Sequence, residues 1–303
     1  MFDAQFSSGA ATALGRFRKL FIEYDFTQEL SRQIQLFHQV SEASDISNLM
    51  LLYGDTGSGK STLVNRYINA VRERVKEAHV EQPVLFVMVP SSCTPKALAS
   101  SLLVALEDPC YNKGTLTDMT VRVVALIRKK KVSLIVLDEF QHFIDRENKK
   151  VAYCSADWLK ELVIQVNCPF LLVGLPSTSR VICENQQLER RVLTKLELRP
   201  LPFSTKADRE RLQTLLLFFA EELPFGNARM IAHEEMARRI HIACRGRMGY
   251  LARLLQQAGM VALEEEELEL KVSHFSKAYD RVRADDKDSL LGVLNPFLAE
   301  KKQ

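Results

Sequence analysis

Long apolar runs are absent from this sequence, and their absence limits what the chain can be. No uninterrupted stretch reaches the roughly 18 apolar residues that a membrane-spanning helix needs. The N-terminus also lacks a basic segment followed by an apolar one, so we predict no secretory signal. We therefore expect a soluble, cytoplasmic protein without a membrane partner.

Cysteine, glycine and proline are all sparse. The six cysteines form no C-x-x-C pair and no histidine stands at ligand spacing from them, which favours reduced thiols over disulfides or a zinc site. Only 12 Gly and 10 Pro among 303 residues exclude a collagen-like chain. A hydrophobic content of 47% excludes disorder for most of the chain.

A strong excess of one charge is missing too. The 41 Lys and Arg nearly balance 38 Asp and Glu, giving a formal net charge of +3. A strongly basic total would have indicated a nucleic-acid partner. Any evidence for DNA binding must therefore come from where the charges are placed.

Short apolar runs alternate with amphipathic stretches from Leu49 onward, and this pattern predicts an α/β fold. The runs that we expect to be strands are Leu49–Tyr53, Val84–Val89, Leu134–Leu137, Phe170–Val173 and Val192–Leu198. Strands alternating with helices imply a five-stranded parallel sheet sandwiched by helices. Beyond Thr205 the pattern is only helical as far as about Ala284.

Residues 54–61 read GDTGSGKS and fit the phosphate-loop pattern G-x-x-x-x-G-K-[ST] between a predicted strand and a predicted helix. Glycines let successive N–H groups turn toward phosphate oxygens, and the helix N-terminus adds its positive dipole end. Lys60 can reach the β- and γ-phosphates, and the Ser61 hydroxyl can ligate Mg²⁺. The candidate ATP-binding residues of this loop are Gly54, Asp55, Thr56, Gly57, Ser58, Gly59, Lys60, Ser61 and Thr62.

Residues 134–139 read LIVLDE, a buried strand that ends in two carboxylates. Ligands bind at the carboxyl edge of open α/β sheets, so we assign Asp138, with Ser61, to Mg²⁺. Glu139 is the candidate for polarising the attacking water, since phosphoryl transfer needs mainly positioning and charge stabilisation. The alternative interpretation is a solvated strand end with two surface acids.

Further polar residues are candidates for sensing the nucleotide. Ser177, or its neighbour Thr178, follows the fourth predicted strand, where a turn with a helix cap is the alternative. Arg190 and Arg191 precede the fifth strand and could act in trans as an arginine finger, or be a solvated pair. Arg247 opens a helix in a glycine-rich stretch and could lean over the phosphates.

Together, the phosphate loop, the acidic strand end, the Arg pair and the helical second domain resemble an AAA+ ATPase over roughly residues 45–285. More narrowly, GDTGSGKSTLVNRY, LIVLDEFQHFID, LLVGLPST and QLERRV are similar to the TniB/TnsC transposition ATPases, with MuB more distant. The predicted organisation is an N-terminal helical extension (1–45), an αβα nucleotide-binding domain (46–202), a helical lid (203–284) and a loosely held C-terminal tail (285–303).

The resemblance implies an ATPase that uses ATP and Mg²⁺ to assemble on double-stranded DNA. Family members form a homo-oligomeric filament or ring, here expected with six or seven subunits per turn, which marks the insertion target and recruits the transposase. Hydrolysis then drives disassembly, and in CRISPR-associated elements a TniQ-type adaptor joins the assembly. The lid departs from the AAA+ Gly-x-x-Arg pattern, because Gly249 stands where Arg is expected, so Arg247 is only a candidate.

Binding to the DNA backbone requires Lys and Arg rather than base-reading geometry. The resemblance places the DNA contacts between the second strand and the segment just after the acidic strand. The candidates there are Lys113, Thr117, Lys149 and Lys150, and a solvated surface residue is the alternative for each. The acidic run 264–267 is expected to be a solvated helix face, or to meet a basic partner.

Two other functions remain open at this point. One is a different AAA+ protein, a replication initiator or helicase loader, although an initiator would usually add a helix-turn-helix domain for which the residues after the lid are few. The other is a nucleotide-switched signalling scaffold with little turnover, against which Glu139 argues, since such proteins often lack a usable catalytic carboxylate.

Overall fold

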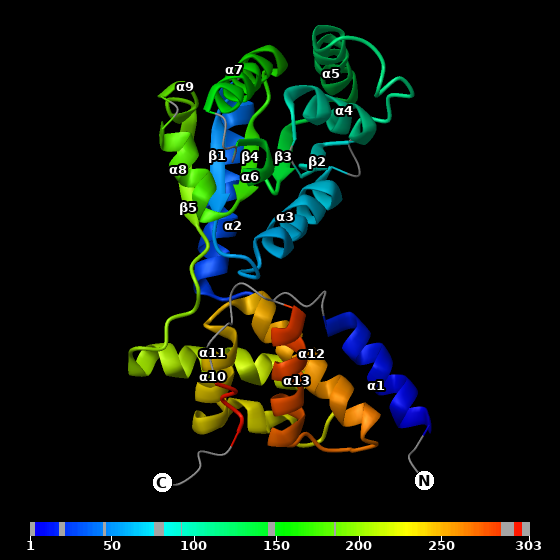
Figure 1. The fold of residues 1–303 in the computed structure, drawn as a ribbon, viewed down its shortest axis with the longest axis vertical. Coiled ribbons are helices and arrows are strands. Elements are labelled where there is room, and N and C mark those ends of the chain that lie inside the picture. Colours follow the sequence, from blue (N-terminus) through cyan, green and yellow to red (C-terminus); the bar gives the residue numbers. More distant parts are fainter. Residues whose placement is uncertain are drawn as a thin grey trace. The chain divides into compact units, whose positions relative to one another are not determined.

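The computed structural model describes residues 4–17, 22–44, 47–75, 82–91, 93–144, 149–184, 186–285 and 294–298. Contacts divide the chain into two compact units (Figure 1). The sheet unit comprises Asp25–Thr56 and Lys60–Leu198. The helical unit comprises Met1–Tyr24, Gly57–Gly59 and Arg199–Gln303. No helix among the described residues combines the length and apolarity needed to cross a bilayer.

Five parallel strands form the centre of the sheet unit, in the order β2-β3-β4-β1-β5. Their side chains are almost all buried except in β5, because helices cover both faces. The strands are β1 (Leu49–Tyr53), β2 (Val84–Met88), β3 (Leu134–Asp138), β4 (Phe170–Gly174) and β5 (Val192–Glu197). The five predicted strands are thus confirmed, each to within one residue at its ends.

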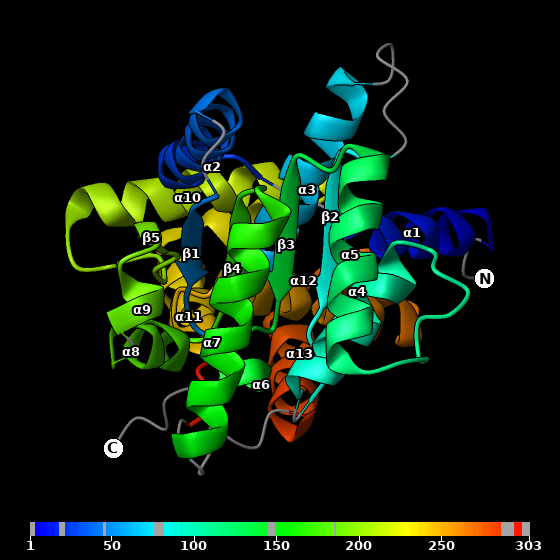
Figure 2. The same cartoon turned by 90° about the horizontal axis from the view of Figure 1, so that it is seen from above.

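Helices of the sheet unit pack on the two faces of the sheet, with α2 and α3 on one face and α4, α5 and α7 on the other (Figure 2). The connection through α4 and α5 joins β2 to β3, and the connection through α7 joins β3 to β4, each returning the chain from the carboxyl edge of the sheet to its amino edge. The helices are α2 (Asp25–Ser44), α3 (Lys60–Arg74), α4 (Pro95–Ala105), α5 (Leu116–Lys130), α6 (Gln141–Ile144), α7 (Lys149–Val166), α8 (Pro176–Glu184) and α9 (Gln186–Glu189).

The helical unit buries its own core, which includes Leu216, Leu255 and Phe275. Thr205 caps α10 in a capping box with Asp208, which satisfies N–H groups at the start of that helix. The elements are α1 (Ala4–Phe17), α10 (Lys206–Glu222), the 3₁₀ helix η2 (Ala228–Ala232), α11 (Glu234–Cys244), α12 (Met248–Glu264) and α13 (Val272–Asp285).

The N-terminal stretch, predicted as one extension over residues 1–45, contributes a helix to each unit. In the helical unit, the Phe17 ring of α1 lies 5.5 Å from Phe219, and Gln256 donates to the Leu14 carbonyl at 2.8 Å. In the sheet unit, Nδ1 of buried His38 on α2 lies 2.9 Å from the hydroxyl of Tyr67 on α3. The two helices therefore belong to different cores.

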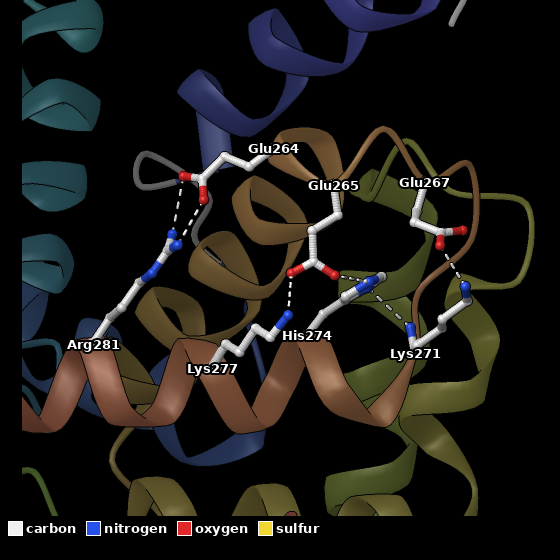
Figure 3. Close-up of polar contacts among 7 residues, drawn as sticks. All are labelled: Glu264, Glu265, Glu267, Lys271, His274, Lys277 and Arg281. Carbon is white, nitrogen blue, oxygen red and sulfur yellow. Dashed lines mark hydrogen bonds and ion pairs between the residues drawn. The ribbon is translucent and has the colours of Figure 1, made fainter.

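Acidic residues at and just after the end of α12 pair with basic residues in and just before α13 (Figure 3). Glu264 and Arg281 form a bidentate pair at 2.6 and 2.9 Å. Two more contacts, Glu265 to Lys277 and Glu267 to Lys271, are each 2.5 Å long. The acidic run is thus not a free solvated face, because the chain itself supplies the basic partners.

Candidate nucleotide-binding site

The carboxyl ends of β1, β3 and β4 meet at one edge of the sheet, and the phosphate loop, the acidic strand end and Ser177 lie there. The N–H of Gly54, just after β1, donates to the carbonyl of Gly174 at the end of β4, at 3.2 Å. The N–H of Phe140, just after β3, donates to the Val173 carbonyl at 2.9 Å. These bonds bring the phosphate loop beside the acidic strand end and the turn that follows β4.

The phosphate loop takes the backbone conformation that its glycines were expected to allow. Gly57 and Gly59 have φ angles of +72° and +102°, which a side chain would strain. Helix α3 starts at Lys60, so its unpaired N–H groups face the loop. Ser58 is buried and its hydroxyl has no hydrogen-bond partner among the described residues. Such a curled backbone at a helix N-terminus suits the phosphates of a nucleotide.

Lys60 is held over the loop rather than extended into solvent. Its Nζ donates to the carbonyls of Gly54 at 2.7 Å and Asp55 at 2.9 Å, and the residue is buried. Burial lowers the pKa of the ammonium, while Glu139 and Asp138 act in the opposite direction. The neighbouring carboxylates and carbonyls thus supply the negative charge that holds this buried cation in place.

Ser61 and Asp138 are brought together from α3 and β3. The Ser61 Oγ donates to Asp138 Oδ2 at 2.7 Å, and Asp138 is buried. A hydroxyl and one carboxylate are oxygen ligands of the kind that Mg²⁺ takes when phosphates complete its shell. Among the described residues no group of three or more His, Cys, Asp or Glu could hold a metal by itself. A hydroxyl and a carboxylate fit Mg²⁺ whose remaining ligands are phosphate oxygens and water.

Glu139 stands at a strained turn, with a φ of +57° that non-glycine residues rarely adopt. Its N–H donates to Asp138 Oδ1 at 2.9 Å. Its carboxylate accepts a short hydrogen bond from the amide of Gln141. The Gln141 side-chain oxygen in turn accepts the N–H of Leu175 at 3.2 Å, so Gln141 joins the carboxylate to the turn after β4.

Gln141 is a site residue that the sequence interpretation missed. It is buried, and both ends of its amide are used. The only signal in the sequence was a polar residue two positions after the carboxylates, next to the aromatic Phe140. A surface position would have given the same signal, because sequence spacing does not show which way a short helix faces.

The two candidates after β4 differ in exposure. Ser177 is half-buried in the first turn of α8. Thr178 is buried, and a side chain on Gly174 would collide with its hydroxyl. Thr178 therefore packs under the turn, and Ser177 remains the candidate for touching a nucleotide.

The arginine candidates lie apart from the nucleotide residues in the chain. Arg190 is exposed and Arg191 half-buried in the turn between α9 and β5. The backbone of Arg191 is fixed, since its carbonyl accepts the N–H of Leu49 at 2.9 Å. Arg247 is the N-cap residue of α12 in the helical unit, where its guanidinium carbon lies 5.4 Å from the Tyr250 ring centre.

Two of the four DNA candidates lie at the start of α5. Lys113 and Thr117 are exposed on either side of the capping residue Thr115. Lys149 and Lys150 form the first turn of α7, and their side chains lie outside the described residues. Because α5 and α7 both run back from the carboxyl edge of the sheet and pack together, their N-termini lie toward that edge.

Arg122 fixes the loop that carries Lys113, a role that could not be inferred from residue spacing. It donates to the carbonyls of Cys110 at 2.8 Å and Lys113 at 2.9 Å, and its Nε bonds Asp108 at 2.8 Å. The exposed tip, residues 111–113, is therefore presented on a pinned backbone.

Comparison with known protein families matches residues 17–200 to the bacterial TniB proteins. The chain belongs to the TniB family. The match covers more than half of the sequence and includes the phosphate loop, the acidic strand end and the Arg pair. A search of the curated proteins finds no match for this TniB chain.

Solved structures confirm the fold of the TniB chain. It is similar to the ORC1 protein of Aeropyrum pernix in complex with DNA, with a TM-score of 0.67 at 20% identity, over 89% of this chain and 70% of that one. ORC2 of the same organism, in ADPNP-ADP complexes, is also similar, with a TM-score of 0.64 at 17% identity, over 89% of this chain and 72% of that one. Domain III of the replication initiation protein DnaA of Thermotoga maritima has a TM-score of 0.50 at 13% identity, over 93% of this chain and 98% of that one. The fold is that of AAA+ proteins, and this TniB chain is an AAA+ ATPase.

Proposed function

We propose that this TniB protein is an ATP-dependent regulator of DNA transposition that oligomerises on double-stranded DNA, marks the target and recruits the transposase. Family membership supports the transposition role. The observation that supports the ATP-dependent part is the bond between Ser61 and Asp138 beside Lys60, because a cation and two oxygen donors then lie at one glycine-rich loop. ATP hydrolysis would then release the assembly from DNA.

Each residue at the carboxyl edge of the sheet would have its own role in binding or hydrolysing ATP. Backbone N–H groups of the loop hold phosphate oxygens, and Lys60 neutralises the β- and γ-phosphates. Ser61 and Asp138 would hold Mg²⁺, which supplies charge neutralisation during phosphoryl transfer. Glu139 orients and polarises the attacking water, and Gln141 fixes the position of that carboxylate. Ser177 would contact the terminal phosphate.

DNA would be held through its backbone by Lys113 and Thr117 at the start of α5, and by Lys149 and Lys150 at the start of α7. One subunit offers few such contacts, and the net charge of the chain is only +3. Affinity would therefore come from many subunits binding one duplex, as multivalent binding allows. The same argument requires a filament or ring, in which Arg191 or Arg190 would reach the ATP of a neighbour. A transposase, and a TniQ-type adaptor, would bind that assembly.

Sedimentation with duplex DNA tests this function directly. The wild-type chain should co-sediment with DNA as large assemblies in the presence of Mg²⁺ and a slowly hydrolysed ATP analogue, and not with ADP. Lys60→Ala should lose this assembly, because the ammonium that neutralises the phosphates is gone. The matched control is Lys206→Ala, since Lys206 is a highly exposed lysine of the helical unit. Assembly by Lys60→Ala with ATP would show that the nucleotide is not the switch.

A replication initiator is the second candidate, because ORC and DnaA structures share the fold and the ORC1 match is a DNA complex. The two functions differ in what the DNA-bound protein recruits. Pull-down with the purified transposase of the same element should succeed only with ATP and DNA present. Capture of a replicative helicase in its place would favour the initiator.

A further inference from the structure

Residues 294–298, part of the tail that was expected to be loosely held, contact α13 of the helical unit. Residues 294–298 read LNPFL. The Asn295 side-chain amide donates to the Ser276 carbonyl at 3.0 Å, to the Ser276 hydroxyl at 3.1 Å and to Asp280 Oδ1 at 3.1 Å. The Asn295 amide thus donates to three acceptors on Ser276 and Asp280, which lie one turn apart on α13. We call residues 294–298 the tail segment.

Phe297 supplies the apolar part of the same contact. It is 3% exposed, and its ring lies 5.7 Å from that of Phe275 and 6.4 Å from that of Tyr279. Its neighbours Leu294 and Leu298 are 87% and 60% exposed. The tail segment therefore binds α13 through one amide and one aromatic ring, and we call the binding surface around Phe275, Ser276, Tyr279 and Asp280 the α13 site.

The tail segment holds its own bound shape. Asn295 Oδ1 accepts the N–H of Phe297 at 3.0 Å, and the Asn295 carbonyl accepts the N–H of Leu298 at 3.2 Å. Pro296 between them has a fixed φ. These bonds within the segment, together with the fixed ring of Pro296, reduce the conformational freedom that the segment loses when it docks.

The fit on α13 leaves one polar group unpaired. Tyr279 is 1% exposed, and its hydroxyl has no hydrogen-bond partner among the described residues. A buried unpaired hydroxyl weakens the packed state, because it gives up its bonds to water. This cost partly offsets the stabilisation that the packing of Phe297 on Tyr279 provides.

Eight residues, 286–293, separate the end of α13 from the tail segment. Fully extended at about 3.3–3.6 Å per residue, such a connection reaches roughly 28 Å. That reach is comparable with the diameter of a small domain, about 30 Å, so exchange requires the α13 site of a neighbouring molecule to lie within that distance. Contacts made in trans are the same as those made in cis, so exchange of an identical element costs little.

We propose that the α13 site is an exchangeable binding site for the tail segment, and that in the assembled protein it holds the tail segment of a second copy. The assembled protein is the oligomer proposed above, so this exchange between copies rests on that function. The site itself, and its preference for an Asn-Pro-Phe turn, do not depend on it. The exchange would tie successive subunits together through their helical units.

A peptide-binding experiment tests the site in the full-length chain. Phe297→Ala should vacate the α13 site, and this variant should bind a fluorescent peptide of residues 288–303. The wild-type chain should bind it at least tenfold more weakly, because its own tail competes at a high effective concentration. A peptide carrying the same Phe297→Ala change should bind the vacated site about a hundredfold more weakly. The matched control Leu298→Ala alters an exposed residue and should leave the chain like wild type.

Equal binding of the peptide by wild type and Phe297→Ala, or no binding by either, would overturn the site. Since Phe297→Ala could disturb the packing of the helical unit, a second measurement leaves Phe297 in place. The photoreactive p-benzoylphenylalanine at exposed position 298 should cross-link to α13 in an otherwise unaltered chain. Cross-linked peptides that exclude α13 would contradict the site equally.

Isotope mixing then shows whether the tail segment binds the α13 site of its own chain or that of a second copy. Photoreactive chains grown in ¹⁵N and ¹⁴N media are mixed in equal amounts and assembled with DNA and an ATP analogue, and assembly is checked by sedimentation. Cross-links that join a labelled tail to an unlabelled α13 are expected in the sedimented fraction. Assemblies with only same-isotope cross-links would overturn the exchange and leave the proposed function intact. Absence of assembly would contradict the proposed function, and mixed cross-links in a concentrated solution would then still decide the exchange.

Discussion

A single glutamine beside the candidate catalytic carboxylate has the clearest consequence among the side chains of the site. Gln141 donates to Glu139 and accepts from the Leu175 N–H, so it fixes where the carboxylate lies. A positioning role predicts a different result from a catalytic role. The two can be separated by comparing variants at positions 139 and 141.

Glu139→Gln should lower ATP turnover at least about a hundredfold while ATP binding persists, because the group that polarises water is neutral. Gln141→Ala should lower kcat by roughly ten- to a hundredfold with little change in KM, because a displaced carboxylate still titrates and still acts. Steady-state ATPase assays with and without duplex DNA measure both. DNA-bound assemblies should persist in Glu139→Gln. Turnover of Gln141→Ala at the wild-type rate would remove Gln141 from the mechanism.

Among the structural elements, the loop before α5 is proposed to contact DNA. This contact can be tested through the salt dependence of DNA binding. Lys113→Ala should remove one backbone contact per subunit, lowering the slope of log K against log salt by about one per bound subunit. Arg122→Ala should have a larger effect, since its guanidinium fixes the carbonyls of Cys110 and Lys113. Fluorescence anisotropy over a salt series measures the slopes, with Lys206→Ala as control. Unchanged slopes would place the DNA elsewhere.

The paired helices α12 and α13 carry a pH-dependent element. His274 is buried in the first turn of α13, where its Nδ1 accepts the Lys271 N–H at 3.1 Å and its Nε2 lies 3.4 Å from Glu265 (Figure 3). Burial lowers the pKa of His274 below its usual value of 6.5, although Glu265 and Glu267 act against this and Lys271 and Lys277 act with it. The pKa values of Glu264 and Glu265 are lowered by Arg281 and Lys277, so these acids stay charged near pH 5.5.

The unfolded chain therefore binds a proton at His274 more readily than the folded chain. The stability that neutral His274 contributes is complete above about pH 6.5 and is lost as the pH falls below it. We expect Tm to drop between about pH 7.5 and pH 5.5, and to drop less in His274→Gln. His38 in the sheet unit is also buried, and burial lowers its pKa below the usual value. It should account for part of the drop in Tm that remains in His274→Gln. Scanning calorimetry at several pH values measures this, and an equal drop in His274→Gln would exclude the residue.

Sequence reasoning predicted the sheet almost residue by residue, because strands covered on both faces must be nearly all apolar. It also predicted the phosphate loop and the carboxylates, whose chemistry requires fixed residue types at fixed spacing. It did not predict Gln141 or Arg122, whose roles depend on contacts with residues far along the chain. Nor did it predict that α1 and α2 join different cores, or that the acidic run binds α13, since helix amphipathicity does not name a partner.

In the proposed assembly, Arg191 of one subunit completes the nucleotide site of its neighbour. Complementation between two inactive variants tests this arrangement. Arg191→Ala keeps every residue of the nucleotide edge but lacks the candidate finger, and should lose on the order of a thousandfold in turnover. Glu139→Gln keeps the finger and lacks the carboxylate. In an equal mixture, about one interface in four of a head-to-tail assembly would join an intact site to an intact finger, so activity should return to roughly that fraction.

Mixing Arg191→Ala with the Glu139→Gln, Arg191→Ala double variant should restore nothing, because no chain then supplies Arg191. Recovery in the first mixture should also require duplex DNA and a protein concentration that permits assembly. If neither mixture regains activity although both sediment with DNA, Arg191 does not act in trans, and Arg190, exposed one position earlier, becomes the residue to exchange in the same design.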